Sequence, residues 1–136
     1  MGGDVMVWKA TAAMRTALDA VISERQRQDA KWGEQNHPMV PSEHRDSPSA
    51  CSYASAILGV PSASNARDAC EWSHRASQGT YAHILVEEVA EFVEACVIHG
   101  ETSDDARAEM VQVAAVALAM LEAIDRKRAT ASEVAK

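Results

Sequence analysis

The stretch Leu85-Val-Glu-Glu-Val-Ala-Glu91 places two glutamates, Glu88 and Glu91, three positions apart on an apolar segment. About twenty residues later, Glu109-Met-Val-Gln112 repeats this spacing with a glutamate and an amide. A helix advances about 100° per residue, so side chains three apart point to nearly the same side. Buried carboxylates cost several kcal/mol each unless they are paired or bind a metal, and oxygen ligands are those that Mg²⁺ prefers. The two motifs therefore predict a magnesium site between two packed helices.

The composition favours closely packed helices over a β-sandwich. The chain has 136 residues, of which 47% are hydrophobic and only 4% aromatic, and alanine and valine dominate the apolar set. This length is enough for one domain with a core. We predict a single all-α domain of the four-helix-bundle type over residues 1–136. The expected helices are approximately residues 5–31, 64–76, 80–99 and 104–128.

Several residues at the ends of these segments are typical of helix termini. Thr80 is suited to cap the start of the third helix, and Gly100 is suited to the position after its end. Ser64 or Asn65 is the expected N-cap of the second helix. Residues 129–136 are expected to be frayed.

Residues 33–63 contain all four prolines and many serines, which predicts a long irregular loop. A short helical turn is expected within it at residues 53–58. Loops of this length inside a compact domain are uncommon and usually functional or mobile.

Charge and cysteine content exclude some functional classes. A formal charge of −7 argues against duplex DNA binding, which needs a basic face. The three cysteines form no CxxC pair, which favours a reducing compartment and hence a cytoplasmic protein. The longest apolar stretch, residues 113–121, is too short to span a bilayer, and the N-terminus lacks the pattern of a signal peptide. We therefore expect no membrane association.

Helical geometry separates the acids of the third helix into two groups. Measured from Leu85, Glu88 and Glu91 lie about 60° and 120° to one side and border the apolar stripe. Glu87 and Glu94 lie nearly opposite that stripe and are expected to be solvated.

On the fourth helix, residues 110–121 are apolar all round except for Gln112, so that helix is expected to be buried on most sides. A domain of this size rarely surrounds a helix fully, which predicts a homodimer or homotetramer. The alternative for the three motif glutamates is ion pairing at a bundle surface. Their candidate partners are Arg75, Arg107 and Arg126.

The order Glu-x-x-Glu, then Glu-x-x-Asp, on consecutive helices is the signature of the all-α nucleoside triphosphate pyrophosphohydrolases. This superfamily includes MazG, the dimeric dUTPases and phosphoribosyl-ATP pyrophosphatase. The stretch Leu85-Val-Glu-Glu-Val-Ala-Glu91 resembles the first motif, and Ala108-Glu-Met-Val-Gln-Val-Ala-Ala115 resembles the second. The segments Glu24-Arg-Gln-Arg-Gln-Asp-Ala-Lys-Trp-Gly-Glu-Gln-Asn-His37 and Glu122-Ala-Ile-Asp-Arg126 are similar to those of MazG-like proteins common in actinobacteria and their phages. One departure is Gln112, which stands where the superfamily has an aspartate.

The resemblance implies a MazG-like fold, an oligomer and a Mg²⁺-dependent reaction, with Mn²⁺ as a substitute. A nucleoside triphosphate would be split into a nucleoside monophosphate and pyrophosphate. The implied metal ligands are Glu88, Glu91 and Glu109, with Gln112 as a weak ligand. Glu87 or Glu91 would orient or deprotonate the attacking water.

Cationic and aromatic side chains would complete the implied substrate site. Arg25, Lys31 and Arg75 are the candidates for contacting phosphate, and Trp32 is the candidate for flanking the base. The competing interpretation is a catalytically weak or inactive helical oligomer that binds nucleotides or a protein partner. Gln112 favours this alternative because an amide carries no charge.

Overall fold

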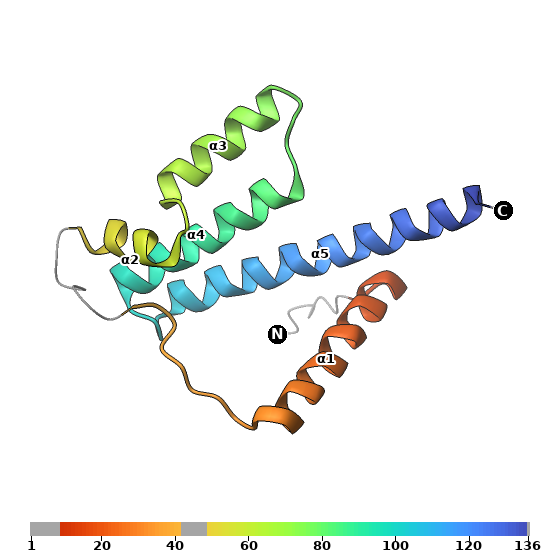
Figure 1. Ribbon diagram of the computed structural model, residues 1–136, viewed down its shortest axis with the longest axis horizontal. Coiled ribbons are helices and arrows are strands. Elements are labelled where there is room, and N and C mark those ends of the chain that lie inside the picture. Colours follow the sequence, from red (N-terminus) through yellow and green to blue (C-terminus); the bar gives the residue numbers. More distant parts are fainter. Residues whose placement is uncertain (1–8, 42–48, 136) are drawn as a thin grey trace, which may run out of the picture. The chain divides into compact units, whose positions relative to one another are not determined.

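The structure, a computed structural model, describes residues 9–41 and 49–135. Those residues form helices without any strand, so the all-α prediction is confirmed. The helices are α1 (Ala12–Trp32), α2 (Ala50–Leu58), α3 (Ala63–Arg75), α4 (Tyr81–His99) and α5 (Asp104–Val134) (Figure 1). The predicted start of the first helix near residue 5 and residues 42–48 of the predicted loop lie outside the described residues.

The chain divides into two compact units. The central unit comprises residues 36–117, and the terminal unit comprises residues 1–35 together with residues 118–136. Helices α2, α3, α4 and the first part of α5 therefore belong to the central unit, whereas α1 and the remainder of α5 belong to the terminal unit. The single domain expected from the sequence stays a prediction.

Side-chain caps fix the starts of α3 and α4. The Thr80 hydroxyl accepts a hydrogen bond from the backbone N–H of His83 at 3.2 Å, as expected for the predicted cap of α4. Gly100 follows the end of that helix with a φ of 100°, which favours glycine. The second predicted helix begins slightly earlier than expected, because Ser62 is its cap and accepts from the N–H of Asn65.

Two predicted irregular segments are helical instead. Residues 50–58 form α2, a full helix rather than a short turn, and contain neither proline nor glycine. Gly59 ends this helix in the left-handed conformation. Helix α5 continues to Val134 instead of ending near residue 128. Its last residues also lack proline and glycine and are rich in alanine, which has the highest helix propensity.

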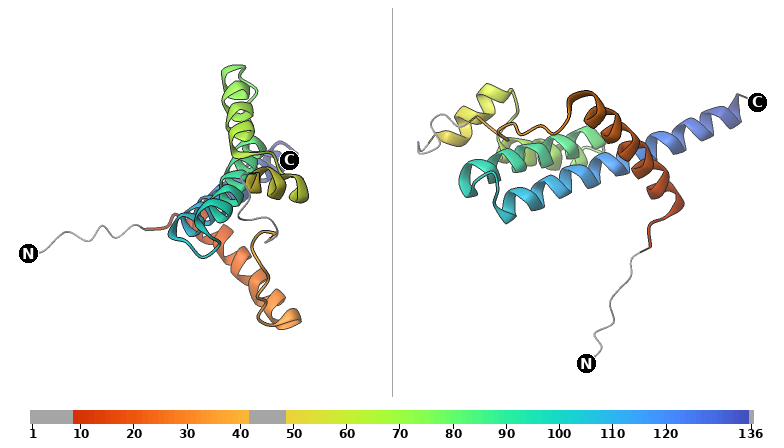
Figure 2. Two further views of the ribbon diagram at one scale, coloured as in Figure 1. Left: turned by 90° about the vertical axis from the view of Figure 1, so that its left-hand side faces the viewer. Right: turned by 90° about the horizontal axis from the view of Figure 1, so that it is seen from below.

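Small side chains form much of the core of the central unit. One cluster of buried residues comprises Val40, Ala54, Val93, Ala95, Cys96 and Ala106. A second cluster consists of Ala63, Ala66 and Ala90 and joins α3 to α4. Small residues allow helices to approach closely, since the distance between helix axes depends on the side chains at the contact. Helix α4 accordingly lies between α3 and the first part of α5 and also contacts α2 (Figures 1 and 2).

Two tryptophans of the described residues are largely exposed. The exposed fractions are 54% for Trp32 and 69% for Trp72, so both rings are largely accessible. The three cysteines, in contrast, are free and at least partly buried. Of the helices in the described parts of the chain, none combines the length and the hydropathy that crossing a membrane requires.

Candidate metal centre

Three carboxylates meet between α4 and the first part of α5 within the central unit. One oxygen from each of Glu88, Glu91 and Glu109 lies within 4.8 Å of the other two. Glu88 and Glu91 are three residues apart on α4, and Glu109 is contributed by α5. All three residues are half-buried. The structure therefore brings together the three glutamates of the two sequence motifs, but no described contact adds the Gln112 amide to them.

The spacing of these oxygens is compatible with a magnesium ion. Mg²⁺ holds its ligands at about 2.0–2.1 Å, so two oxygens on one ion are at most about 4.2 Å apart. The three oxygens, which lie within 4.8 Å of one another, are close to that separation. Three carboxylates leave the remaining positions to water or phosphate, as is usual for Mg²⁺ in proteins.

Burial and mutual repulsion raise the pKa values of two members of this cluster, Glu88 and Glu109. Burial raises the pKa of Glu88, and the charges of Glu91 and Glu109 raise it further. Burial also raises the pKa of Glu109, with the charge of Glu91 and a side-chain hydrogen bond to Glu91 as the next causes. A divalent cation would reverse this balance, because it favours the ionised form of every carboxylate around it.

Arg67 supplies a positive charge beside the cluster. Its Nε donates a hydrogen bond to Oε1 of Glu91 at 3.1 Å, and its Nη2 lies 3.7 Å from Oε1 of Glu94. The hydrogen bond to Glu91 is the main cause that raises the pKa of the Arg67 guanidinium. Arg67 projects from α3, so the ion pairs connect that helix to α4.

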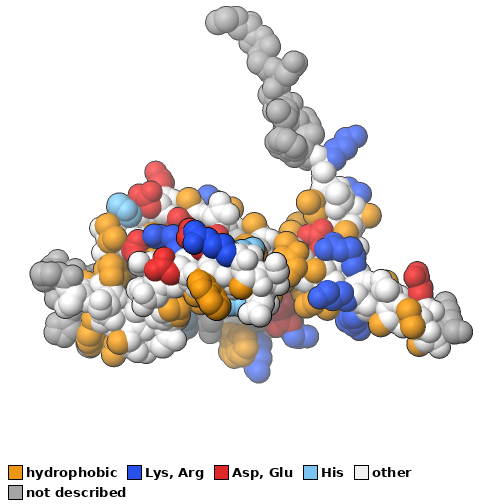
Figure 3. All heavy atoms as spheres, turned by 90° about the horizontal axis from the view of Figure 1, so that it is seen from above, with side chains coloured by type: hydrophobic (Ala, Val, Ile, Leu, Met, Phe, Trp, Pro, Cys, Tyr) orange, Lys and Arg blue, Asp and Glu red, His pale blue; other side chains and the backbone are white. Residues whose placement is uncertain are grey.

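A polar hollow surrounds this arginine. It has a volume of about 220 Å³ and is shared by α3, α4 and α5. Its charged and titratable lining residues are Arg67, Glu91, Glu94, His99, Asp105 and Glu109. On the face seen in Figure 3, basic and acidic side chains lie next to one another. The hollow therefore combines an excess of carboxylates with one arginine.

Two acids predicted to be solvated have partners in the structure. Glu94 faces Arg67, as its 3.7 Å separation from the guanidinium shows. Glu87 is half-buried and hydrogen-bonds the Cys70 thiol, whose pKa is raised first by burial and then by this bond. Glu87 is therefore less solvated than expected, whereas the Glu94 side chain is still 38% exposed. Helix α4 contacts both α2 and α3, so the direction opposite its apolar stripe is not uniformly open to solvent.

The remaining predicted site residues are not brought into the carboxylate cluster by any described contact. Gln112 lies one turn after Glu109 on α5 and is exposed in the single chain, so its role as a weak ligand stays a prediction. Arg75 lies near the end of α3, where its Nη2 is 3.9 Å from Oε2 of Glu71. The proposed pairing of the motif glutamates with Arg75 is therefore replaced by the pairing of Glu91 with Arg67.

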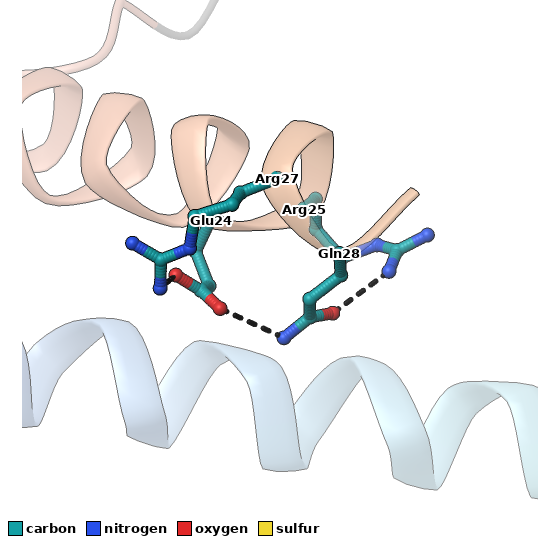
Figure 4. Close-up of polar contacts among 4 residues, drawn as sticks. All are labelled: Glu24, Arg25, Arg27 and Gln28. Atoms are coloured by element: carbon teal, nitrogen blue, oxygen red, sulfur yellow. Dashed lines mark hydrogen bonds and ion pairs between the residues drawn. The ribbon is translucent and has the colours of Figure 1, made fainter. Parts of the chain in front are cut away.

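The other predicted phosphate and base contacts belong to the terminal unit. Arg25 donates to the Gln28 amide oxygen at 2.8 Å (Figure 4). Its Nη2 also lies 4.0 Å from Oδ1 of Asp29 on the same helix. The Lys31 ammonium lies 4.7 Å from the centre of the Trp32 ring, which is a cation–π contact. Their roles at a substrate stay predictions.

Arg67 is the residue that the sequence motifs did not identify. It stands outside both carboxylate motifs, 24 positions before Glu91. The available signal was electrostatic, since an acidic cluster on a chain of net charge −7 favours a nearby cation. Selecting Arg67 over the other basic residues required the packing of α3 against α4.

Comparison with known proteins gave no relative. No protein-family model, curated protein or solved structure matches the chain.

Proposed function

We propose that this protein is a Mg²⁺-dependent nucleoside triphosphate pyrophosphohydrolase with a MazG-like all-α fold. The observation that carries the proposal is the convergence of Glu88, Glu91 and Glu109 from two adjacent helices. The order and spacing of the sequence motifs support the same class. Two further features agree with it, namely the raised pKa values of Glu88 and Glu109 and the polar hollow beside them.

The proposed reaction assigns distinct tasks to the residues of the cluster. Glu88, Glu91 and Glu109 would hold the ion, and the exposed amide of Gln112 would be a weak ligand. When bound, the ion would supply Lewis acidity for the hydrolysis of the triphosphate. Of the two carboxylates predicted to activate water, Glu91 belongs to the cluster, whereas Glu87 contacts Cys70. We therefore assign the orientation of the water to Glu91.

An apolar hollow in the central unit is suited to a nucleobase. It has a volume of about 280 Å³, and its lining includes Phe92 and Met110, which directly follow Glu91 and Glu109 in the sequence. Ligand pockets generally combine an apolar lining with a few polar groups. Replacing Met110 with Glu would place a charge at this hollow, and the KM for the nucleotide should rise. An unchanged KM would exclude this hollow as the base site.

Oligomerisation is also part of the proposal. On α1, Met14, Leu18, Val21 and Ile22 follow helical spacing, and each is between 40% and 46% exposed. Contiguous exposed apolar surface of this kind often marks a protein interface. Light scattering coupled to size exclusion should show a dimer or tetramer, and Leu18→Glu should reduce its mass. Ala20→Glu, on the opposite side of α1, is the matched control and should leave the mass unchanged.

Pyrophosphate release from a panel of canonical and modified nucleoside triphosphates tests the proposed activity. The assay is run with Mg²⁺, with Mn²⁺ and with EDTA. Glu91→Gln should abolish metal-dependent release while the helical content by circular dichroism stays unchanged. Glu71→Gln is the matched control, because Glu71 is exposed and pairs only locally with Arg75. Full activity of the Glu91 variant would exclude the assigned site.

The second candidate is a catalytically weak or inactive oligomer that binds nucleotides or a partner protein. Gln112 favours it, since an amide in place of a carboxylate lowers the charge available for a second cation. A nucleotide that raises the melting temperature in the presence of Mg²⁺ without releasing pyrophosphate would select nucleotide binding. In either case, the reducing compartment inferred from the cysteines makes the cytoplasm the proposed location.

A further inference from the structure

The ion pair between Arg67 and Glu91 uses a carboxylate that also belongs to the candidate metal centre. Glu91 contributes one oxygen to the cluster with Glu88 and Glu109, and its Oε1 accepts from the Arg67 guanidinium. A residue on the same helix as Arg67, Glu71, lies at the i+4 position and pairs with Arg75 instead. Arg67 therefore reaches across to α4 although a carboxylate is within helical range on α3.

A divalent cation and Arg67 compete electrostatically at Glu91. Two positive groups on one carboxylate repel each other, and each reduces the negative charge that the other experiences. The Arg67 side chain is 47% exposed, so it has room to rotate away from the ion pair into the adjoining hollow. Glu94, its second partner, is 38% exposed and outside the cluster of three.

Arg67 also has the chemistry of a phosphate ligand. A guanidinium binds phosphate oxygens in a bidentate geometry and keeps its charge at all relevant pH values. The other charged groups that line the hollow are acids, apart from His99, so a polyphosphate entering it would find Arg67 as its main cationic contact there. A phosphate held by a metal at the cluster would bring its oxygens towards the same hollow, because Glu91 and Glu109 line both.

We infer that Arg67 is an exchangeable cation, which holds Glu91 and Glu94 in the free protein and transfers to the phosphates when a metal–polyphosphate complex binds. This inference rests on the proposed function and identifies a residue that selects a metal-bound polyphosphate over the free metal. It predicts that removing Arg67 changes the affinity for the metal and the affinity for the polyphosphate in opposite directions. Removing Arg67 strengthens binding of the metal alone and weakens binding of the metal together with a polyphosphate.

The test uses Mn²⁺ and inorganic tripolyphosphate with the full chain. Mn²⁺ binding is measured by electron paramagnetic resonance, and tripolyphosphate binding at saturating Mn²⁺ is measured by calorimetry. In Arg67→Gln, Mn²⁺ alone should bind about 2- to 5-fold more tightly, as expected for loss of one exposed competing charge. Tripolyphosphate should bind about 10-fold more weakly, as expected for loss of a charged hydrogen bond.

Arg27→Gln is the matched control. It makes the same chemical change and removes an arginine–glutamate ion pair, namely that of Arg27 with Glu24 on α1 (Figure 4). Neither affinity should change in this variant. Arg67→Lys gives a second measurement if the Gln variant does not fold. Its Mn²⁺ affinity should equal that of the wild type, while tripolyphosphate binding should fall because the bidentate geometry is lost.

Three results would overturn the inference. The first is that the affinities change equally in the Arg27 and Arg67 variants. The second is that the affinities for Mn²⁺ and tripolyphosphate change in the same direction in Arg67→Gln, and the third is that the wild type does not bind Mn²⁺. The outcome is separable from that of the proposed function. If the Mn²⁺ and tripolyphosphate affinities of Arg67→Gln shift in opposite directions but no nucleotide releases pyrophosphate, the proposed enzyme activity is disproved and the role of Arg67 is retained. If a nucleotide is hydrolysed but the two affinities do not shift in opposite directions, the activity is retained and the role of Arg67 is disproved.

Discussion

Helix α1 and the α3–α4 pair both carry many charged residues, but they use them differently. On α1, the partners of Arg25 and Glu24 among the described residues lie three or four positions away and include Gln28 (Figure 4). Between α3 and α4, Arg67 and Glu91 are 24 residues apart and meet through the packing of two helices. Local pairs such as those on α1 each stabilise the helix by a few tenths of a kcal/mol, and the sequence spacing of three or four residues predicts them. Interhelical pairs such as Arg67 with Glu91 form only when the unit folds, and this pair lies at a hollow that a ligand can enter.

The largest expected difference between the two regions is in catalysis. Glu109→Gln should reduce metal-dependent pyrophosphate release by about 100-fold or more, because it removes a charge that positions the ion. Glu24→Gln changes a glutamate whose partners among the described residues are Arg27 and Gln28 on the same helix, and this variant should retain activity. Initial rates at saturating Mg²⁺ provide the measurement. Comparable losses in both variants would mean that the cluster has no special role.

The next effect concerns packing rather than charge. Val93 is 5% exposed in the core of the central unit, so Val93→Ala should lower the free energy of unfolding by about 2 kcal/mol, through lost burial and a cavity. Val134, in the terminal unit, is 82% exposed, and Val134→Ala should change stability by less than about 0.5 kcal/mol. Urea unfolding followed by circular dichroism compares the two. A small effect at Val93 would show that the central core tolerates a cavity there.

A smaller loss of stability is expected for Arg67→Gln in the absence of metal. The substitution leaves Glu91 and Glu94 without their cationic partner, beside two other carboxylates. Arg27→Gln should have a weaker effect, because its pair lies on one exposed helix. Melting temperatures in EDTA give the comparison, and saturating Mg²⁺ should remove most of the deficit at Arg67. Equal melting temperatures for the two variants would contradict the distinction between local and interhelical pairs.

The smallest expected effect is a pH dependence that arises in the central unit. The pKa values of Glu88 and Glu109 are raised above the ordinary value of 4.5, so the folded chain binds more protons than the unfolded chain above that pH. The free energy of unfolding in EDTA should therefore fall as pH rises from 4.5 through the raised pKa values. Glu109→Gln should flatten this dependence. A stability that rises over the same interval in the wild type would contradict the raised pKa values.

The parts of the structure that follow from local rules were predictable from the sequence. Thr80 and Gly100 marked the ends of α4, and the two motifs predicted the meeting of Glu88, Glu91 and Glu109. Their convergence needs only helical periodicity and contact between neighbouring helices.

The parts that depend on packing were not predictable in the same way. The positions of Glu87, Glu94 and Arg67 follow from the contact of α3 with α4, which no short-range pattern encodes. Helix α2 was missed for a different reason. Prolines on both sides of it favoured a loop assignment, although residues 50–58 themselves contain no helix-breaking residue.

The alanine cluster between α3 and α4 has a consequence for electrostatics. Ala66 precedes Arg67, Ala90 precedes Glu91, and both alanines are buried in the same contact. The 3.1 Å separation between the guanidinium and the carboxylate therefore depends on how closely two methyl groups allow the helices to approach. A larger residue at either position would lengthen the ion pair without altering either charge. In the central unit, the size of the alanine methyl groups therefore sets the distance between the charges of Arg67 and Glu91.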